Sequence, residues 1–162
     1  SIKKKYKLGF KLVRGAYMEI ENERAYKNKI PSPIFEKKIQ TDLSFNSALD
    51  IILLNTEQCE LFVGTHCEKS IAKVLKWMKE KNISNGYSKI WFSQLFGMAD
   101  HISFNLASQG YQVVKYVPYG PIKKVVPYLI RRAEENTSIN SQLPKEISLI
   151  KKEMKRRKLN RI

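Results

Sequence analysis

The chain has 162 residues, of which 43% are hydrophobic and 28% are charged, and its 30 Lys and Arg residues outnumber 15 Asp and Glu residues. This length corresponds to a single domain. The apolar fraction lies near the globular average of about 45 to 50%, which argues against a largely disordered chain. No apolar run reaches the roughly 20 residues that span a bilayer, and the first ten residues lack the pattern of a secretory signal. We therefore expect a soluble, cytoplasmic protein.

The net charge of +15 makes nucleic acid or an anionic membrane surface a candidate partner, because both attract Lys and Arg in bulk. Most of the basic residues are scattered singly or in short runs, a distribution that surface solubility alone also explains. The spacing of Cys59 and Cys67 matches neither a disulfide framework nor a CxxC metal or redox motif. We expect two buried thiols.

Short β-rich segments alternate with helical segments along the chain. Each β-rich segment ends at a turn that contains glycine, proline or polar residues. The predicted strands are residues 8–13, 61–63, 90–92 and 113–117. The predicted helices are residues 44–54, a segment that follows Ser70, residues 99–108 and residues 126–136. This alternation predicts an α/β fold with parallel strands joined by right-handed crossovers.

Particular residues predict where three of these helices begin or end. Apolar side chains recur at three- and four-residue spacing in residues 71–78, the pattern of an amphipathic helix, with Ser70 as the predicted N-cap. Gly110 is expected in a left-handed conformation at the end of the third helix. Pro127 is expected in the first turn of the fourth helix, because deeper in that helix it would remove a backbone hydrogen bond.

The four strand-helix units, residues 1–140, fit either an open doubly wound sheet or part of a (β/α)₈ barrel. No GxGxxG sequence follows the first strand, so the dinucleotide-binding form of the open sheet has no support. A complete barrel of eight units takes about 250 residues. Four units in this chain therefore correspond to about half a barrel.

The tail, residues 141–162, is predicted to form a separate basic helix. Eight basic residues stand in it against two acidic ones. Ile147, Ile150 and Met154 fall three and four residues apart, which gives one apolar stripe on a helix expected to begin just after Pro144. Such a helix either docks on the protein or binds anionic lipid.

In parallel α/β folds the functional residues lie at the carboxyl ends of the strands and in the loops that follow. In this chain those positions hold residues 11–17, 64–67, 94–98 and 115–121. Thr65 and His66 offer hydrogen-bond donors for a phosphate, a ribityl chain or a ring carbonyl, although a histidine at a strand end is often only structural.

Arg131 and Arg132 are neighbours on the fourth predicted helix. Two planar guanidinium groups can grip a carboxylate through several charge-assisted bonds, which lysines could not match. Tyr128 and Glu135 stand three or four residues from this pair and can lie beside it on the helix. Adjacent arginines are also common as solvated surface charge.

Two other kinds of site have little support. Cys67 beside His66 offers a nucleophile next to a base, but neighbouring residues in an extended segment point apart. Asp42, Asp50 and Asp100 are not spaced as metal ligands with either histidine, so no metal site is predicted.

Six short segments follow the order of the signature motifs of proline dehydrogenase, the flavoenzyme family that oxidises L-proline. The segments are KLVRGAY, TD at Thr41 and Asp42, THC, QLFGMAD, KYVPYGP and PYLIRRAEEN. Each one is weak alone, but their ordered occurrence over residues 11–136 is specific, so the chain resembles this family. The tail is similar to that of the monofunctional, mitochondrial-type enzymes.

The resemblance implies the C-terminal half of a distorted (β/α)₈ barrel that holds FAD at the carboxyl ends of its strands. It makes the missing amino-terminal half, with its further flavin contacts, a partner of this chain. By this resemblance the substrate is held by Arg131 and Arg132 at its carboxylate and by Leu95, Tyr116 and Tyr128 around its ring. The residues expected to touch FAD are Lys11, Arg14, Gly15, Ala16, Tyr17, Thr65 and His66.

The implied reaction is hydride transfer from C5 of L-proline to N5 of the flavin, which yields Δ1-pyrroline-5-carboxylate, with electrons passed to a membrane quinone. Peripheral contact with the inner membrane, mitochondrial in a eukaryote, accompanies that acceptor. Lys11 stands where many bacterial members have arginine, and Cys67 replaces the usual asparagine. The alternative is a basic module for RNA or an anionic membrane; the lack of an aromatic-rich motif such as RNP1 argues against nucleic acid.

Overall fold

The computed structural model of the chain describes residues 6–138 and 142–159, which form two compact units. The first unit ends at Lys115 and contains the sheet, and the second begins at Tyr116 and contains two helices. Within the described residues, no helix is both long and apolar enough to cross a membrane.

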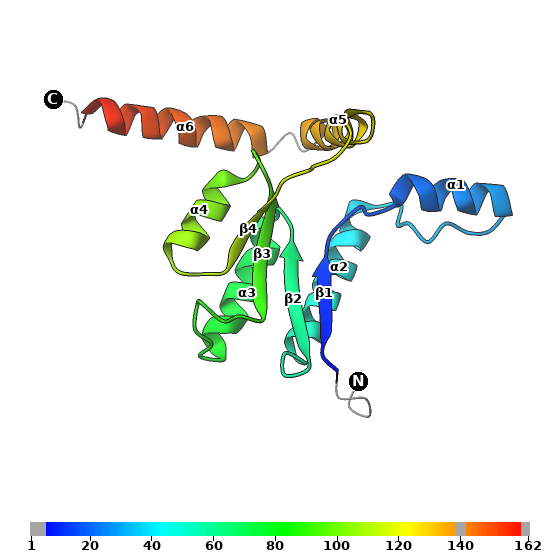
Figure 1. Ribbon diagram of the computed structural model, residues 1–162, viewed down its shortest axis with the longest axis horizontal. Helices are drawn as coiled ribbons and strands as arrows, with labels where there is room; N and C mark the ends of the chain where they lie inside the picture. Colours follow the sequence, from blue (N-terminus) through cyan, green and yellow to red (C-terminus); the bar gives the residue numbers. More distant parts are fainter. Residues whose placement is uncertain (1–5, 139–141, 160–162) are drawn as a thin grey trace. The chain divides into compact units, whose positions relative to one another are not determined.

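Strands and helices alternate along the first unit (Figure 1). In chain order its elements are β1 (Leu8–Leu12), α1 (Met18–Asn28), α2 (Lys38–Leu53), β2 (Cys59–Gly64), α3 (Glu68–Glu80), β3 (Ile90–Leu95), α4 (Asp100–Ser108) and β4 (Val113–Tyr116), whose last residue is the first of the second unit. The second unit holds α5 (Ile122–Ser138) and α6 (Gln142–Leu159).

The strands form one sheet in the order β1-β2-β3-β4. β1 is parallel to β2 with Lys11 opposite Phe62, and β2 is parallel to β3 with Phe62 opposite Trp91. The backbone N–H of Phe92 donates to the carbonyl of Gln112, just before β4. The predicted α/β fold with four consecutive parallel strands is confirmed.

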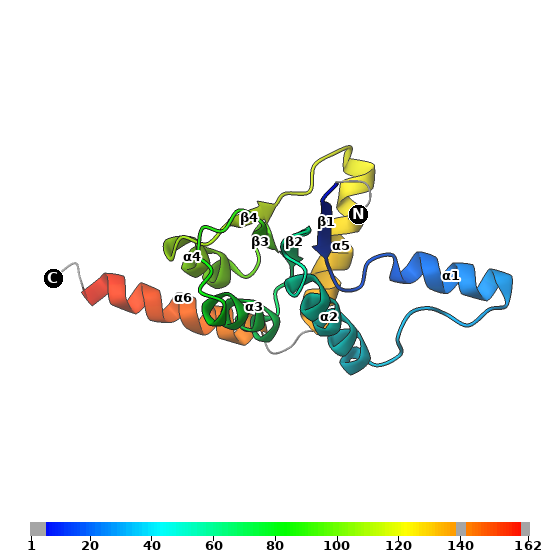
Figure 2. The same ribbon diagram turned by 90° about the horizontal axis from the view of Figure 1, so that it is seen from below.

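The core lies between the sheet and helices α2, α3 and α4, and Figure 2 shows α2 and α3 side by side along the sheet. Alternate residues of β2 are buried, as expected for a strand with one face on helices. Each fully buried aliphatic side chain contributes about 1.5 to 3 kcal/mol. The buried cluster consists of Phe45, Leu49, Ile52, Leu53, Cys59, Leu61, Val63, Ile71, Val74, Met78, Ile90, Phe92, Ala99, Ile102 and Leu106.

A row of three side chains crosses the opposite face of the sheet. Lys11, Phe62 and Trp91 are paired in register on β1, β2 and β3. The Phe62 and Trp91 rings are stacked with centroids 6.3 Å apart, and Nζ of Lys11 lies 5.9 Å from the Phe62 centroid. In a (β/α)₈ barrel the face away from the helices is the interior, where side chains from neighbouring strands meet in layers.

Helix α3 begins two residues before the predicted N-cap. Its N-cap is Cys67, so the prediction of Ser70 as the cap is wrong. Ser70 is 1% exposed, and its hydroxyl accepts from Arg14 and donates to Asn46. The Ser70 hydroxyl, which the local sequence predicts as a helix cap, is therefore used in tertiary hydrogen bonds to Arg14 and Asn46 instead.

Helices α5 and α6 also begin earlier than predicted. The N–H of Val125 donates to the carbonyl of Pro121, so α5 begins at Ile122. Pro127 thus lies inside the helix, where it cannot donate a backbone hydrogen bond, and its predicted place in the first turn is wrong. Helix α6 begins at Gln142, before the tail proline instead of after it.

Helix α1 is absent from the predicted elements. Its sequence is rich in charge, and Ala25 is its buried residue, so it shows no apolar stripe that a periodicity search would find. Gly110 has a φ of +82°, which confirms the left-handed position predicted after α4.

Candidate active site

The guanidinium of Arg14, just after β1, contacts side chains on α2, after β2 and on α3. Nη1 donates to Oγ1 of Thr65 and Nη2 donates to Oγ of Ser70, both at 2.8 Å. Nε lies 2.7 Å from Oδ1 of Asp42 on α2, as an ion pair more than an aligned hydrogen bond. The guanidinium carbon lies 3.8 Å from the ring centroid of Phe45. The planar fork of arginine allows these contacts together, whereas a lysine could make only part of them.

Thr65 links the ends of three strands. Its Oγ1 accepts from Arg14 and also from the backbone N–H of Cys67 at 3.1 Å. Its N–H donates to the carbonyl of Ser93, and its carbonyl accepts from Nε2 of Gln94, each at 3.2 Å. The segment after β2 is therefore tied to β3 through the backbone and to the end of β1 through a side chain.

His66 is held by the end of β3. Its Nε2 accepts from the backbone N–H of Leu95 at 3.0 Å. A ring nitrogen that accepts carries no hydrogen, so the imidazole is neutral with its hydrogen on Nδ1. Gln94, which is 1% exposed, receives a further hydrogen bond at Oε1 from the hydroxyl of Ser103 at 2.9 Å. These buried polar groups are satisfied by one another, which makes the strand ends rigid.

Cys67 is only partly buried, whereas Cys59 is buried as expected. Burial raises the pKa of the Cys67 thiol, but contacts with the N–H and hydroxyl of Ser70, together with the charge of Arg14, outweigh it. The pKa therefore lies below its ordinary value of 9.0. A thiol at a helix N-terminus beside a cation is expected to behave in this way.

The turn after β1 is open to solvent. Gly15 has a φ of +70°, and no atom lies within 4 Å of the position that a Cβ would take there. Tyr17 also has a positive φ, 58°, and is 73% exposed. Gly15, Ala16 and Tyr17 are all exposed, as contact with an external group requires.

The loop after β3 is fixed by Lys115 on β4. Its Nζ donates to the carbonyl of Met98 at 2.7 Å and lies 2.6 Å from Oδ1 of Asp100. Gly97 and Ala99 both have positive φ, +76° and +50°. For the buried Ala99 this conformation costs about 1 to 2 kcal/mol, which the surrounding contacts offset.

In the second unit, two predicted substrate residues are in contact and Arg132 joins them. The rings of Tyr116 and Tyr128 meet edge to face with centroids 6.3 Å apart. The guanidinium carbon of Arg132 lies 5.2 Å from the Tyr128 centroid. The side chains of Arg131 and Glu135 lie outside the described residues.

The predicted site residues thus fall into contacting groups within each unit. Arg14 touches Thr65, and His66 touches Leu95, while Lys11 lies on the inner face of the sheet. That these residues bind FAD, and that those of the second unit bind the substrate, stays a prediction.

Sequence reasoning missed the supporting polar residues. Asp42 was considered only as part of the TD motif and as a rejected metal ligand, and Ser70 only as a helix cap. Gln94 and Ser103 are buried polar residues that satisfy each other. A signal existed for Ser103, which stands in an amphipathic helix between the buried Ile102 and Leu106, where an apolar residue is expected.

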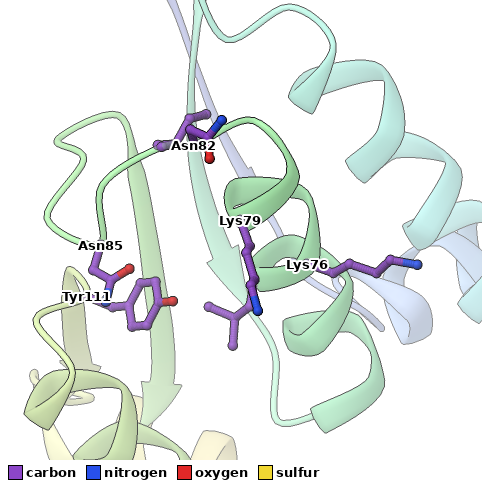
Figure 3. Close-up of a pocket in the computed structure, with 7 residues that line it drawn as sticks. Lys76, Lys79, Asn82, Asn85 and Tyr111 are labelled. Atoms are coloured by element: carbon purple, nitrogen blue, oxygen red, sulfur yellow. The ribbon is translucent and has the colours of Figure 1, made fainter.

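A hollow of about 500 Å³ lies away from these strand ends, and Figure 3 shows its lining side chains. The lining residues are Leu75, Lys76, Lys79, Asn82, Ile83, Asn85 and Tyr111. They come from α3, the loop that leads into β3 and the approach to β4, so the hollow lies at the amino ends of the strands. Over the part of the chain that the structure describes, no three metal-ligating side chains are grouped to hold an ion.

A parallel α/β sheet with polar side chains gathered at the carboxyl ends of its strands is the arrangement in which α/β enzymes carry their active sites. The proline dehydrogenase family matches residues 1–145. The chain belongs to the proline dehydrogenase family, a family of flavoprotein oxidoreductases.

Individual relatives show the same relationship. Proline dehydrogenase 1, mitochondrial, of Dictyostelium discoideum is 43% identical over 157 residues, which cover 94% of this chain and 27% of the relative. Hydroxyproline dehydrogenase of Xenopus laevis is 40% identical, over 94% of this chain and 34% of the relative. The human proline dehydrogenase 1, mitochondrial, is 38% identical, over 92% and 25%. The chain thus spans about a quarter to a third of these relatives.

Among solved structures, the chain is similar to proline utilization A (PutA) from Bdellovibrio bacteriovorus inactivated by N-propargylglycine. The TM-score is 0.74 with 26% identity, over 84% of this chain and 14% of that one. The four parallel strands match part of that chain, which confirms the predicted family and fold class. Because the similar proteins include both separate dehydrogenases and PutA, the monofunctional type stays a prediction.

The residues present fit FAD, the cofactor of this family. Flavin carbonyls, ribityl oxygens and phosphates are mostly acceptors, so their site needs donors. Lys11, the hydroxyl of Thr65 and the Nδ1 hydrogen of His66 are donors at or near the strand ends. The open turn at Gly15 leaves space for a close approach.

Proposed function

We propose that this chain forms the C-terminal half of a proline dehydrogenase barrel that oxidises L-proline to Δ1-pyrroline-5-carboxylate with FAD. One observation carries the proposal: hydrogen bonds join the carboxyl ends of β1, β2 and β3. Arg14 bonds Thr65, Gln94 bonds Thr65, and the N–H of Leu95 bonds His66. A rigid donor set is what hydride transfer requires, because the reacting atoms must be held in one geometry.

In this proposal the protein binds and orients, and bound FAD supplies the hydride acceptor. Thr65 and His66 donate hydrogen bonds to the cofactor. Arg131 and Arg132 hold the substrate carboxylate through charge-assisted bonds. The rings of Tyr116 and Tyr128, together with Leu95, exclude water from the substrate. The reaction needs no protein nucleophile, because the hydride passes directly to the cofactor.

The remaining strands of the barrel come from an amino-terminal half, which is the first partner we propose. A quinone in the membrane then receives the electrons. Relatives named as proline and as hydroxyproline dehydrogenases are both similar to this chain, at 43% and 40% identity. The test must therefore offer both substrates.

The test uses a chimaera in which this chain replaces the matching 157 residues of the Dictyostelium discoideum relative. We expect the purified chimaera to carry oxidised flavin, and L-proline added without oxygen to bleach its visible absorption. Parallel additions of 4-hydroxyproline show which substrate is preferred. The chain alone, treated in the same way, shows whether the half is sufficient.

The control is the double variant Arg131→Met, Arg132→Met of the chimaera. It should retain the flavin and lose the bleaching, because it lacks the carboxylate clamp. A chimaera that folds but holds no flavin, when the parent protein purified beside it does, would contradict the proposal. Bleaching by 4-hydroxyproline alone would replace L-proline as the substrate.

A second function, binding to an anionic membrane surface, is favoured by helix α6. Ile147, Ile150 and Met154 form its apolar stripe and are 44%, 59% and 55% exposed. By helical spacing, Lys151 and Arg157 flank this stripe on either side. An apolar stripe between cations is the pattern of a helix that lies in the plane of an anionic membrane.

One of the two acidic residues of α6, Glu153, is paired with two of the basic residues of the helix. Arg156 donates two hydrogen bonds of 2.7 Å to Glu153, and Arg157 donates one of 2.9 Å. These contacts lower the pKa of Glu153 to about 2, so it stays ionised and paired. We propose that α6 brings the dehydrogenase to the membrane that holds its quinone.

Sedimentation with vesicles tests this second function. We expect binding to vesicles of phosphatidylcholine and phosphatidylserine, weakened by added salt, and little binding to phosphatidylcholine alone. Ile150→Asp should weaken binding several-fold, whereas Leu149→Asp, on the same helix but off the stripe, should weaken it less. Equal effects of the two variants, or tighter binding to RNA than to vesicles, would contradict it.

A further inference from the structure

We propose that Arg14 is a positioning residue for the flavin site, which acts through Thr65 by forcing the Thr65 hydroxyl to be a hydrogen-bond donor toward the cofactor. The proposal rests on the proposed flavin site and assigns Arg14 a role other than direct contact. Its basis is the set of contacts that Arg14 makes inside the protein.

The guanidinium of Arg14 is occupied by the protein on each nitrogen. Nη1, Nη2 and Nε face Thr65, Ser70 and Asp42, which are 51, 56 and 28 positions away in sequence. One face of the group is covered by the ring of Phe45. Only 19% of the Arg14 side chain is exposed, so most of its surface contacts the protein and little is left to contact a ligand.

These contacts determine which hydrogen bond Thr65 can still make. A hydroxyl has two lone pairs and one hydrogen. In Thr65 both lone pairs are engaged, one by Nη1 of Arg14 and one by the N–H of Cys67. The hydroxyl can then only donate, so Thr65 selects an acceptor such as a flavin carbonyl, ribityl oxygen or phosphate oxygen.

The guanidinium of Arg14 also fixes the direction in which the Thr65 hydroxyl can donate. Ser70, in the first turn of α3, is fixed by Arg14 on one side and by Asn46 on the other. Thr65 and the start of α3 are therefore both joined to the end of β1 through the side chain of Arg14. A lysine at position 14 would keep the charge but could not hold Thr65, Ser70 and Asp42 together.

The first test is a double-mutant cycle on the dissociation constant of FAD in the chimaera described above. We expect Arg14→Lys and Thr65→Val each to weaken FAD binding by about tenfold, the loss of one buried hydrogen bond. If Arg14 acts through Thr65, Arg14→Lys should weaken binding less than about twofold when Thr65→Val is already present. Arg24→Lys, an exposed arginine on α1, is the matched control and should leave FAD binding unchanged.

Two results of this cycle would overturn the proposal. The first is an Arg14→Lys variant that binds FAD as the parent does. The second is a double variant whose loss is the product of the two single losses, because Arg14 would then contact the cofactor independently of Thr65.

The second test needs no cofactor and uses the reactivity of Cys67 in the chain itself. The rate of alkylation by iodoacetamide is followed against pH, with Cys67 and Cys59 distinguished by peptide mass. We expect the Cys67 midpoint to lie below that of an ordinary thiol, to rise in Arg14→Gln, and to stay unchanged in Arg24→Gln. Ser70→Ala, which keeps the arginine, should also raise the midpoint, because it removes the contact between the Ser70 hydroxyl and the thiol.

The two tests distinguish failure of the proposed function from failure of the role proposed for Arg14. A chimaera without FAD contradicts the proposed function, and the Cys67 titration then still decides whether Arg14 organises this loop. A Cys67 midpoint that is the same in Arg14→Gln, in Ser70→Ala and in the unchanged chain would overturn the role of Arg14.

Discussion

Asp42 makes the stability of the strand-end network depend on pH. Burial raises the pKa of its carboxyl, but the hydrogen bond from Lys38 and the charge of Arg14 outweigh burial and leave the pKa below its ordinary value of 3.8. A carboxyl with a lowered pKa in the folded state stabilises the fold above its unfolded pKa. That contribution is lost as the pH falls through the folded pKa.

We therefore predict that Asp42→Asn lowers the free energy of unfolding near neutral pH and that its difference from the unchanged chain shrinks below about pH 3.8. Urea unfolding at a series of pH values measures this difference. Asp50→Asn, on the same helix with a half-exposed side chain paired to Lys73, should cost less near neutral pH. A difference for Asp42→Asn that stays constant across the series would show that Lys38 and Arg14 do not lower the pKa of Asp42 in the folded state.

Arg132 gives a prediction about substrate binding. Its guanidinium lies against Tyr128, the position expected for a carboxylate clamp beside the substrate ring. Losing a charge-assisted hydrogen bond costs about 1.5 to 3 kcal/mol. Arg132→Met in the chimaera should therefore raise the KM for L-proline by about 10- to 150-fold, with a smaller change in kcat.

Initial rates over a series of proline concentrations measure this effect. Arg156→Met is the control, because Arg156 is an exposed arginine on α6 that pairs with Glu153. It should leave the KM unchanged. A KM in Arg132→Met equal to that of the parent would remove this residue from the clamp.

At the scale of elements, β1 and β2 meet closely at Gly64. A Cβ on Gly64 would lie 2.7 Å from Cγ1 of Val13 and 3.0 Å from the carbonyl oxygen of Leu12. Gly9, in β1, has no atom within 4 Å of its Cβ position. The two glycines of the same pair of strands therefore differ in the space that they leave.

We predict that Gly64→Ala lowers the free energy of unfolding by about 1 to 3 kcal/mol, because the strands must separate to admit the methyl group. Gly9→Ala is the matched variant and should be neutral or slightly stabilising, by up to about 1 kcal/mol. Urea unfolding followed by circular dichroism measures both. Equal losses in the two variants would show that the strands do not approach closely at Gly64.

The strands were predictable because their signals are local. Each has a short apolar run that ends at a turn, and all four are found where sequence placed them, with β2 and β3 longer by a few residues. The start of α3 was not predictable, because the partner of Ser70 is Arg14, 56 positions away. Helix α1 had no apolar stripe to reveal it.

In the candidate site, too, local sequence signals were predictable and long-range contacts were not. Thr65, His66 and Arg14 could be proposed from sequence because they follow predicted strands and because their motifs resemble a family; their role in binding FAD stays a prediction. The hydrogen bonds among them were not predictable, since each joins residues that only the folded sheet brings together. The ion pair of Asp42 with Arg14 was not predictable either, because nothing in the local sequence of Asp42 indicates a partner on another element.

At the scale of the whole molecule, β1 lies at the edge of the sheet. Its Leu8 and Phe10 are each 37% exposed. An exposed strand edge with apolar side chains pairs readily with other chains. We predict that the isolated chain self-associates, as measured by light scattering across a concentration series. A monomer at every concentration would contradict this prediction.

The row of Lys11, Phe62 and Trp91 offers a way to monitor the association of the two proposed barrel halves by fluorescence. Trp91 is partly exposed on the face of the sheet away from the helices, which is the interior face in the proposed barrel, and its Nε1 donates to the carbonyl of Ser88 at 2.8 Å. The second tryptophan, Trp77, lies on α3, on the helical side of the sheet. In the proposed barrel, an arriving amino-terminal half would cover Trp91 and leave Trp77 on the helical side, so we predict that the emission of Trp91 shifts to shorter wavelength. The protein thus carries an intrinsic optical reporter of its own closure.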